Sequence, residues 1–405
     1  MLGFVDTAVI GHLPSPAYLA GAALGSLLIT LLFWLLGFLR MSTTALVAQA
    51  FGKRDLLQQV SVIAQGLTWI AILSVLIIGF QSQIFQLLLF LIDKVQMEAA
   101  LTIARQYFDI RIWITPFALT SLVLTGFLIG RGETKVVLYG VLACNLINLL
   151  ADLLFVPVLG YGIEGVAYAS VLAEGSLFFY YLKKVSLKIN GLSLFRWSLF
   201  KLEKSLFSLN RDIFLRSFLL QLCLSFMTIY ATRFGPIEVA VNAILLQFFL
   251  FISFSLDGIA FSLESLVGQT QGNKQTKKLK IYIRTGLILS SLFALIYSLL
   301  YMLLSPAIVS MLTNIEVIKL AMSSYTPWVI LFPLVSYLSF IMDGIYIGLA
   351  WSKAMLATML FAAIVFFSVV LLTMALNNHG LWLAFCCFMF ARGLSQAWFL
   401  KKSLY

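Results

Sequence analysis

Long, uninterrupted apolar runs constrain what this chain can fold into more than any other feature. Most of them are about 20 residues or longer, the length that a helix needs to cross the ~30 Å hydrocarbon core of a bilayer. Barrel strands need only about 10 residues and alternate apolar with polar side chains, a pattern that these runs lack. Because backbone N–H and C=O groups find no water in hydrocarbon, only helices and closed barrels span it. The sequence therefore predicts an all-α integral membrane protein.

The composition of the chain agrees with this prediction. Its 405 residues are 62% hydrophobic and only 11% charged, which is more apolar surface than one soluble core of this size can bury. The net charge of +11 does not indicate nucleic-acid binding, because the basic residues lie in short segments between apolar runs and not on one helix face. The four cysteines lie inside apolar runs without disulfide or metal-ligand spacing, and we interpret them as packing residues.

Charged and Gly/Pro clusters divide the hydropathy profile into predicted spans. One apolar stretch, from Met1 to about Leu13, is too short to cross alone, and it lacks the basic start and cleavage site of a signal peptide. We therefore expect twelve transmembrane helices, the first of them truncated. The other eleven spans cover residues 17–48, 60–92, 106–130, 136–158, 163–183, 212–234, 239–268, 282–304, 322–349, 354–376 and 380–400.

Basic residues gather in every second loop. Lys53 and Arg54 follow the first long span, Arg131 and Lys135 lie two loops further on, and Lys274 to Arg284 form the most basic loop of the second half. The intervening loops carry few basic residues. The positive-inside rule makes the basic loops cytoplasmic, which places both termini in the cytoplasm and suits the inner membrane of a bacterium.

The two halves of the chain resemble each other at a nearly constant offset. One offset aligns residues 49–52 (QAFG) with 269–272 (QTQG), and an offset shorter by two pairs Gly126 with Gly344. A shared offset at matching positions indicates duplication. Six helices in each copy give both the same orientation, so we expect two six-helix bundles related by a pseudo-twofold along the membrane normal, as in alternating-access carriers.

The duplication also predicts the domain organisation. We expect an N-terminal six-helix lobe over residues 1–184 and a C-terminal six-helix lobe over residues 211–405. The polar segment between them, residues 185–210, is expected to be a cytoplasmic linker that lies along the membrane surface, because aromatic and basic residues interleave in it.

Polar residues inside the predicted spans are the candidate functional residues, because a charge at mid-bilayer costs about 2.5–3.5 kcal/mol on insertion scales. Asn148 and Asp152 are four residues apart and share one helix face, where their oxygens suit a proton or Na⁺. With Asp6 nearby they form a candidate cation site. The alternative is that Asn148 and Asp152 only satisfy backbone groups at helix ends or form hydrogen bonds between helices.

Four further polar positions are candidates for lining a substrate cavity or for joining helices of the second lobe. They are Glu174, Asp257, Glu264 and Asp343. Asp257 and Glu264 are seven residues apart on one helix face, which fits either a cavity lining or an interhelical hydrogen bond. Arg392 lies close enough to the end of its span to extend to the interface.

Several short motifs resemble the multidrug and toxic compound extrusion (MATE) family, and its DinF-like branch in particular. They are residues 5–13 (VDTAVIGHL), 39–44 (LRMSTT), 48–52 (AQAFG) and 343–348 (DGIYIG). The resemblance implies a twelve-helix antiporter that exports lipophilic, often cationic compounds in exchange for H⁺ or Na⁺. It implies a monomer in the lipid bilayer, with no cofactor besides the coupling ion and no metal besides Na⁺.

The resemblance also implies roles for individual residues. Asp6 matches an acidic residue of the first helix that takes part in coupling, and Asn148, Asp152 and Ser170 match a cation-binding cluster of the N-terminal lobe. Ser170 stands where threonine is common and keeps the oxygen ligand. Asp343 matches an acidic position of the C-terminal lobe that another branch uses.

Two alternatives keep the same fold. One is a flippase for lipid-linked oligosaccharides, a class that usually carries a strongly cationic cavity, whereas the polar residues here are mainly acidic. The other is an inactive, truncated paralogue, which the short first helix favours. An enzyme is not indicated, because no cluster of nucleophile, base and orienting group is visible, and His12 and His379 fall in predicted outer loops.

Overall fold

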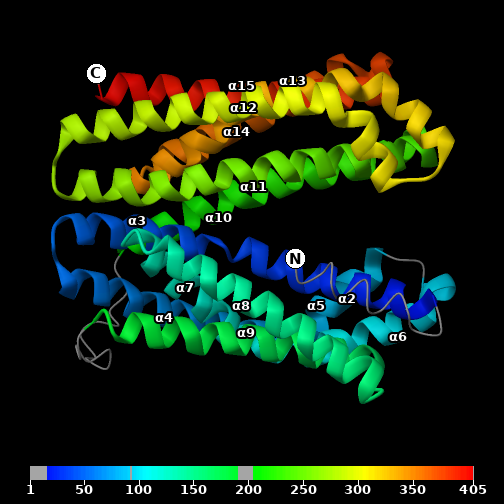
Figure 1. Cartoon of the computed structure of the whole chain (residues 1–405), viewed down its shortest axis with the longest axis horizontal. Helices are drawn as coiled ribbons and strands as arrows, with labels where there is room; N and C mark the ends of the chain where they lie inside the picture. The colour runs from blue at the N-terminus through cyan, green and yellow to red at the C-terminus, as the bar shows by residue number, and fades with distance from the viewer. Residues whose placement is uncertain (1–15, 92–93, 190–203, 405) are drawn as a thin grey trace. The chain divides into compact units, whose positions relative to one another are not determined.

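The computed structural model describes residues 16–91, 94–189 and 204–404 of the chain, and this part is built of helices without strands. Figure 1 shows the helices as long rods joined by short turns. Asp6 and His12 lie outside the described residues, as do positions 190–203 of the predicted linker. On either side of those positions, α9 continues to Ser186 and α10 begins at Lys204.

Within the described residues, most elements follow one another through short connections. The first half contains α2 (Pro16–Leu35), α3 (Phe38–Gly52), α4 (Leu56–Gly79), α5 (Gln81–Leu91), α6 (Lys94–Arg111), the 3₁₀ turn η1 (Ile112–Ile114), α7 (Thr115–Gly130), α8 (Thr134–Leu153), the π-helical turn η2 (Leu154–Val158) and α9 (Gly162–Ser186). The second half contains α10 (Lys204–Ala231), η4 (Thr232–Phe234), α11 (Pro236–Gly272), α12 (Thr276–Leu312), α13 (Glu316–Leu349), α14 (Ser352–Leu372), η5 (Met374–Leu376) and α15 (Asn377–Leu404).

The predicted all-helical membrane fold is confirmed. Within the described residues, ten helices are long and apolar enough to cross a membrane, and α9 adds a further helix of 25 residues. Each of the eleven long predicted spans corresponds to one of these helices or helix pairs. The helices extend beyond the spans, because a helix continues after its side chains leave the hydrocarbon. The basic segment from Lys277 to Arg284, predicted as a loop, forms the first turns of α12.

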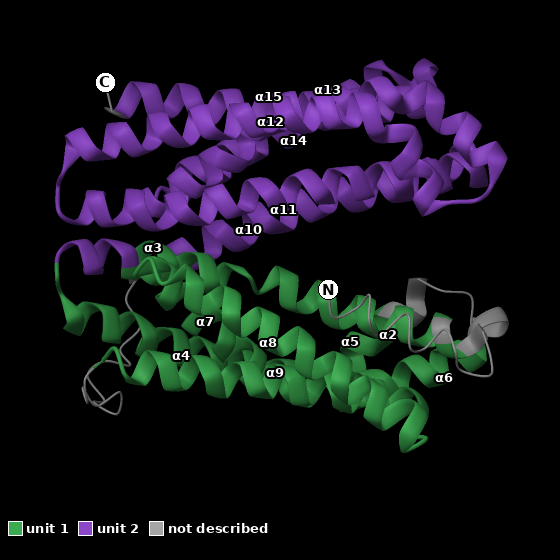
Figure 2. Ribbon diagram, in the orientation of Figure 1, with its two compact units in different colours: residues 1–47, 54–206 green, residues 48–53, 207–405 purple. Residues whose placement is uncertain are grey.

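The chain divides into two compact units, shown in different colours in Figure 2. The first unit comprises residues 1–47 and 54–206, and the second comprises residues 48–53 and 207–405. The end of α3 belongs to the second unit because it packs closely on α11 there: a Cβ added to Gly52 would collide with the backbone of Gln269, and one added to Gly272 would collide with that of Gln49.

Each unit uses a glycine at an equivalent helix crossing. In the first unit, a Cβ built on Gly126 of α7 would lie 2.6 Å from the carbonyl oxygen of Arg40. In the second, a Cβ built on Gly344 of α13 would lie 2.5 Å from that of Ala260. Arg40 and Ala260 are themselves separated by the same offset as the QAFG and QTQG segments. The same backbone contact thus recurs in both copies of the repeat, which supports duplication in three dimensions.

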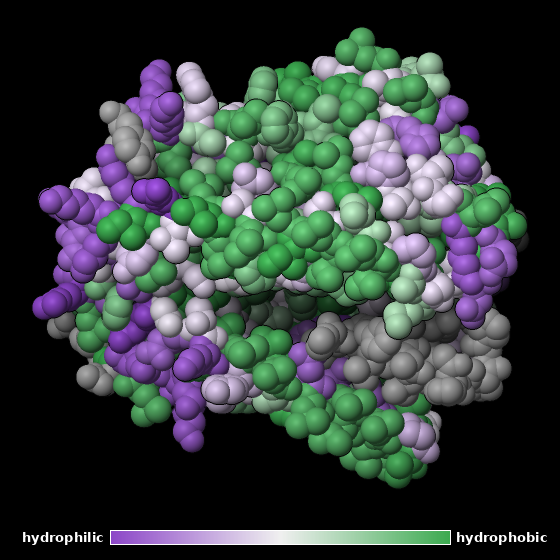
Figure 3. Space-filling view, turned by 45° about the horizontal axis from the view of Figure 1, so that its top comes forward, coloured by the Kyte–Doolittle hydropathy of each residue, from purple (hydrophilic) through white to green (hydrophobic). Residues whose placement is uncertain are grey.

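Apolar side chains cover the outer faces of the helices between their ends. Ile229 of α10, Phe254 of α11 and Leu303 of α12 are 69%, 70% and 69% exposed. Figure 3 shows large hydrophobic areas over the middle of the visible face and hydrophilic side chains near helix ends. Such a surface is expected to face lipid, and it confirms that the chain is an integral membrane protein.

Candidate functional sites

The first candidate site lies on α8 and α9 of the first unit. Asn148 and Asp152 of α8 are both 0% exposed, and Ser170 of α9 is 1% exposed. The two helices pack against each other and are joined only by η2 and residues 159–161, so they run in opposite directions. We call these three residues the oxygen cluster.

The repeat indicates that Asn148 and Ser170 of the oxygen cluster lie at one level of this helix pair. The offset between the two crossing glycines, Gly126 and Gly344, also pairs Asn148 with Phe366 and Ser170 with Phe388. In the second unit these two rings are in edge-to-face contact, with centroids 6.0 Å apart. Because α14 and α15 pack as α8 and α9 do, Asn148 and Ser170 are expected to lie at matching heights in the first unit.

A buried ion pair joins α6 to α9 close to the oxygen cluster. Arg111 Nη2 donates to Glu174 Oε1 at 2.8 Å, and the two side chains are 7% and 15% exposed. Cys144, one turn before Asn148 on α8, is within electrostatic reach of both Arg111 and Glu174. The ion pair therefore lies within about one helical turn of the cluster.

Asn148 of the oxygen cluster has unused capacity for hydrogen bonding or coordination. Neither Nδ2 nor Oδ1 of Asn148 has a hydrogen-bond partner within the described residues, and the same holds for Oε2 of Glu174. A buried polar group without a partner costs about 1–3 kcal/mol. Amide, carboxylate and hydroxyl oxygens at such a position suit a hard cation such as Na⁺ or a proton.

The second unit has a different polar cluster, centred on Asp343 of α13. Its Oδ2 accepts hydrogen bonds from Arg216 of α10 and Arg392 of α15, and its Oδ1 accepts one from Gln396 Nε2 at 3.0 Å. Gln396 is held in turn, because Tyr346 donates its hydroxyl to the Gln396 carbonyl oxygen at 2.7 Å. Three helices are thereby joined through one buried carboxylate, an arrangement that we call the Asp343 clamp.

The remaining acidic candidates lie on α11. Asp257 is half-buried and within electrostatic reach of Arg392, whereas Glu264 is 2% exposed. The structure therefore brings Asp257 close to the Asp343 clamp, and it places Glu264 where α11 closely approaches Gly348 of α13.

The prediction that Arg392 extends to the interface is wrong. Its side chain is 2% exposed, because Asp343 supplies a counter-ion deep in the bundle. Sequence reasoning also missed Arg111, Arg216 and Gln396. A signal existed for the two arginines, since each lies several residues inside a predicted span, where a charge needs a partner.

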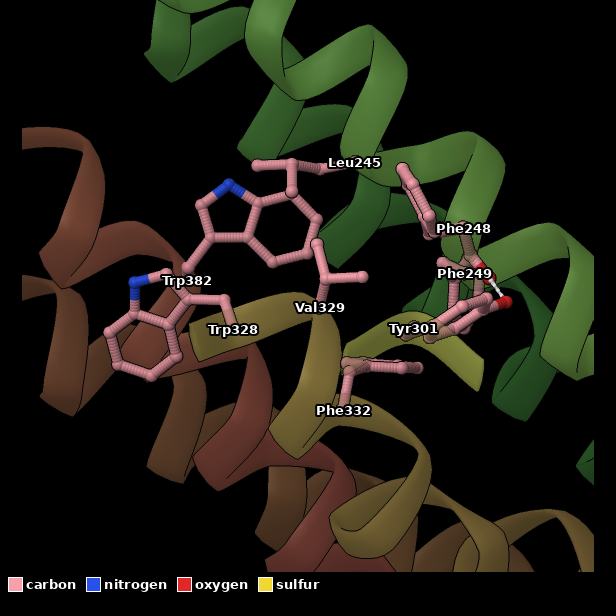
Figure 4. A pocket seen from close by; sticks show the side chains of 8 residues that line it. All are labelled: Leu245, Phe248, Phe249, Tyr301, Trp328, Val329, Phe332 and Trp382. Atoms are coloured by element: carbon pink, nitrogen blue, oxygen red, sulfur yellow. Dashed lines mark hydrogen bonds between the residues drawn. The ribbon is translucent and has the colours of Figure 1, made fainter. Parts of the chain in front are cut away.

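An aromatic region occupies the second unit where α11, α13 and α15 meet, and Figure 4 shows the side chains that line its small cavity. The cavity measures about 10 Å³, the space of roughly one water molecule. Beside it, Asn242 Oδ1 accepts hydrogen bonds from Asn378 and from Trp382 Nε1, at 3.0 and 2.7 Å. This region is packed too tightly to admit a drug-sized ligand.

His379 was predicted in a short outer loop, and the structure corrects this. It lies in the first turn of α15, which begins at Asn377. Its Nδ1 accepts a hydrogen bond from Trp328 Nε1 at 2.9 Å, and its ring stacks on Tyr325 with centroids 4.4 Å apart. Its contacts are those of a packing residue.

An open apolar groove of about 650 Å³ runs along the first unit between α4 and α7. That volume is in the range of ~300–1,000 Å³ found for small-molecule sites. Ser74 and Thr120 contribute the hydroxyl groups in an otherwise apolar lining, which also includes Pro116. Within the described residues, no group of three or more His, Cys, Asp or Glu side chains is placed to hold a metal ion.

Long apolar helices, a lipid-compatible surface and ionisable clusters buried within the spans define a polytopic membrane protein of the transporter class. The MatE family model matches residues 1–154 and 213–372, and the chain belongs to this family. Over 402 residues it is 36% identical to DNA damage-inducible protein F of Escherichia coli (strain K12), covering 98% of this chain and 87% of that protein.

Solved structures of the same family share the fold. A MATE protein crystallised in the bent conformation matches with a TM-score of 0.88 at 19% identity, over 100% of this chain and 92% of that one. An outward-facing multidrug resistance MATE family transporter of the MOP superfamily gives 0.88 at 18% identity, over 99% and 91%. The resemblance to the MATE family and its DinF-like branch is therefore confirmed, and the chain is a transporter rather than an enzyme.

Proposed function

We propose that this chain is a secondary active efflux transporter, which exports lipophilic or cationic compounds in exchange for H⁺ or Na⁺ by alternating access. The observation that carries the proposal is the oxygen cluster of the first unit. Asn148, Asp152 and Ser170 are fully or almost fully buried, and the amide of Asn148 has no hydrogen-bond partner within the described residues. In a transporter, a buried polar group of this kind is a candidate ligand for the coupling cation.

The coupling cation would bind to oxygen atoms of these residues, with Asp6 as the proposed fourth contributor. A bound proton or Na⁺ neutralises the Asp152 carboxylate, which is costly to keep charged inside a bilayer. Antiport follows if cation and cargo favour different conformations, because a ligand shifts an equilibrium only through its differential affinity for the two states.

The groove between α4 and α7 supports a lipophilic cargo. Its lining is almost entirely apolar, and its volume of about 650 Å³ suits a drug-sized molecule. No basic residue is among the described residues that line it, so they offer nothing that would favour an anionic cargo. We place the protein, as a monomer, in the inner membrane of a bacterium with both termini in the cytoplasm.

A flippase for lipid-linked oligosaccharides receives less support. Such a protein needs basic groups available to a polyanionic headgroup. The buried arginines of the second unit, Arg216 and Arg392, are both bonded to Asp343 and are 5% and 2% exposed.

The proposal is tested by efflux of a fluorescent lipophilic cation from cells that express the chain, with and without a protonophore or Na⁺. We expect Asp152→Asn and Asp6→Asn to abolish efflux at normal membrane levels. Asp109→Asn is the matched control, because the Asp109 side chain is 43% exposed and its ion pair within the described residues is with Arg105 on the same helix. Undiminished efflux in both cluster variants would refute the proposal.

A further inference from the structure

The Arg111–Glu174 ion pair is not part of the proposed cation site, yet it lies beside it. Glu174 follows Ser170 by one turn on α9, and Cys144 precedes Asn148 by one turn on the antiparallel α8. Cys144 lies within electrostatic reach of both members of the pair. The pair thus lies one level away from Asn148 and Ser170, about 6 Å along the helices.

At this distance the charge of Arg111 matters to a cation in the cluster. In a medium of effective dielectric about 20, a unit charge roughly 7 Å away changes the affinity for a monovalent cation by about 10- to 100-fold. The ionised Glu174, at 2.8 Å from the guanidinium, offsets most of that repulsion. The net charge beside the cluster is therefore controlled by Glu174.

Among the residues that the structure describes, few other charged groups lie near the pair. The helices α2 and α7, which pack on α6 and α9, carry no charged residue. On α6, Arg105 and Asp109 bond to each other at 2.8 Å and are 36% and 43% exposed. On α8, Asp152 is the ionisable carboxylate, and it belongs to the oxygen cluster itself.

The repeat shows that pair and cluster occur together. At the offset between the two crossing glycines, the three cluster residues correspond to Phe366, Val370 and Phe388. Glu174 corresponds to Arg392, which is bonded to Asp343. The second copy has lost, or never acquired, both the oxygen ligands and the acidic partner. Joint presence in one copy and joint absence from the other is expected of groups that work together.

We infer that Glu174 is a positioning residue for cation coupling: by pairing with Arg111, it offsets the positive charge that would otherwise repel the coupling cation from the oxygen cluster. This inference rests on the proposed function. The Arg111–Glu174 pair then has two roles: it sets the affinity for the coupling cation, and it joins α6 to α9.

The test uses the purified full-length chain and titrates Na⁺ and H⁺ separately, reading the rise in unfolding temperature that accompanies cation binding. For Glu174→Gln, the half-saturating cation concentration is expected to rise at least tenfold. For Arg111→Gln it is expected to fall, and the double variant Arg111→Gln/Glu174→Gln is expected to return to within about threefold of the wild type.

Two further variants keep the test decisive. Glu174→Asp retains the charge and is expected to restore most of the affinity, whereas Glu164→Gln, an exposed position on the same helix, is the control and is expected to change nothing. An unchanged midpoint in Glu174→Gln, or a double variant as impaired as Glu174→Gln, would overturn the inference alone. A wild-type chain that responds to neither cation would overturn the proposed function and the inference with it.

Discussion

Glu174 and Arg392 occupy equivalent positions in the two copies of the repeat, and each belongs to a buried ion pair. Glu174 is the acidic member of its pair, whereas Arg392 is the basic member of its pair. Glu174 accepts a hydrogen bond from Arg111 of α6, whereas Arg392 donates to Asp343 of α13. A single ancestral position has therefore acquired opposite charges in the two units. The two units thus differ in the buried polar groups that these equivalent positions carry.

The difference extends to the neighbouring residues. Asn148 and Ser170 of the first unit correspond to Phe366 and Phe388 of the second, whose rings are in contact. Aromatic packing fills space and offers no oxygen ligand. We therefore expect cation coupling to depend on the first unit and the Asp343 clamp to stabilise the second.

Replacing Asn148 by leucine distinguishes two roles of this residue, that of a cation ligand and that of a hydrogen-bonding group between helices. Because its amide is buried without a hydrogen-bond partner in the described part of the chain, leucine should raise the stability of the cation-free protein by about 1–3 kcal/mol. The same variant should lose the stabilisation that Na⁺ or H⁺ confers. Thermal unfolding in detergent measures both effects. Destabilisation of the cation-free protein would instead show that Asn148 joins helices.

Breaking the Asp343 clamp should cost stability. Asp343→Asn leaves the buried guanidinium groups of Arg216 and Arg392 without their shared carboxylate, and loss of one member of a buried pair typically costs about 3–5 kcal/mol. Glu316→Gln is the control, since Glu316 is 83% exposed and should change stability by less than about 1 kcal/mol. A stable Asp343→Asn protein with an altered cation dependence would mean that Asp343 is a coupling site.

The glycines at the equivalent helix crossings should not tolerate a side chain. Gly126→Ala and Gly344→Ala each place a Cβ within 2.6 Å of a backbone oxygen, and such overpacking typically costs about 1–3 kcal/mol. Gly258→Ala on α11 meets nothing within 4 Å and should be neutral or stabilising. Equal unfolding temperatures for all three variants would contradict the close crossings.

Filling the apolar groove should affect cargo without affecting the cation. Ala71 is exposed in the groove, so Ala71→Trp should lower efflux of large lipophilic compounds several-fold while leaving the Na⁺ or H⁺ response of the unfolding temperature intact. Leu76→Trp, on the same helix at a residue that is 48% exposed and outside the groove, is the matched control. Equal efflux by the two variants would exclude the groove as a cargo surface.

Much of the fold could be predicted from the sequence because hydropathy is a local property. Each of the eleven long spans appears as helix, and the repeat offset recurs in the crossings at Gly126 and Gly344. Helix ends were predicted less well, since α12 continues through a basic segment that hydropathy excludes. A helix ends where its backbone hydrogen bonds end, and hydropathy does not report that.

The partners of buried charges could not be predicted in this way. Arg111 and Glu174 are 63 residues apart, and Arg216 and Asp343 are 127 residues apart. A single sequence carries no pairwise information at such separations, so Glu174 and Asp343 were identified as candidates while their arginine partners were not. Aligning the two copies residue by residue would have exposed the reversal between Glu174 and Arg392.

Antiport itself is tested most directly in proteoliposomes that contain only the purified chain. A lipophilic cation is loaded on one side, and an inward gradient of Na⁺ or of H⁺ is imposed with the membrane potential clamped at zero. We expect one of the two gradients to drive substrate uphill, and Asp152→Asn to abolish this movement while Asp109→Asn preserves it. Uphill movement without either gradient, or gradient-driven movement that survives in Asp152→Asn, would contradict a cation-coupled antiporter built around the oxygen cluster.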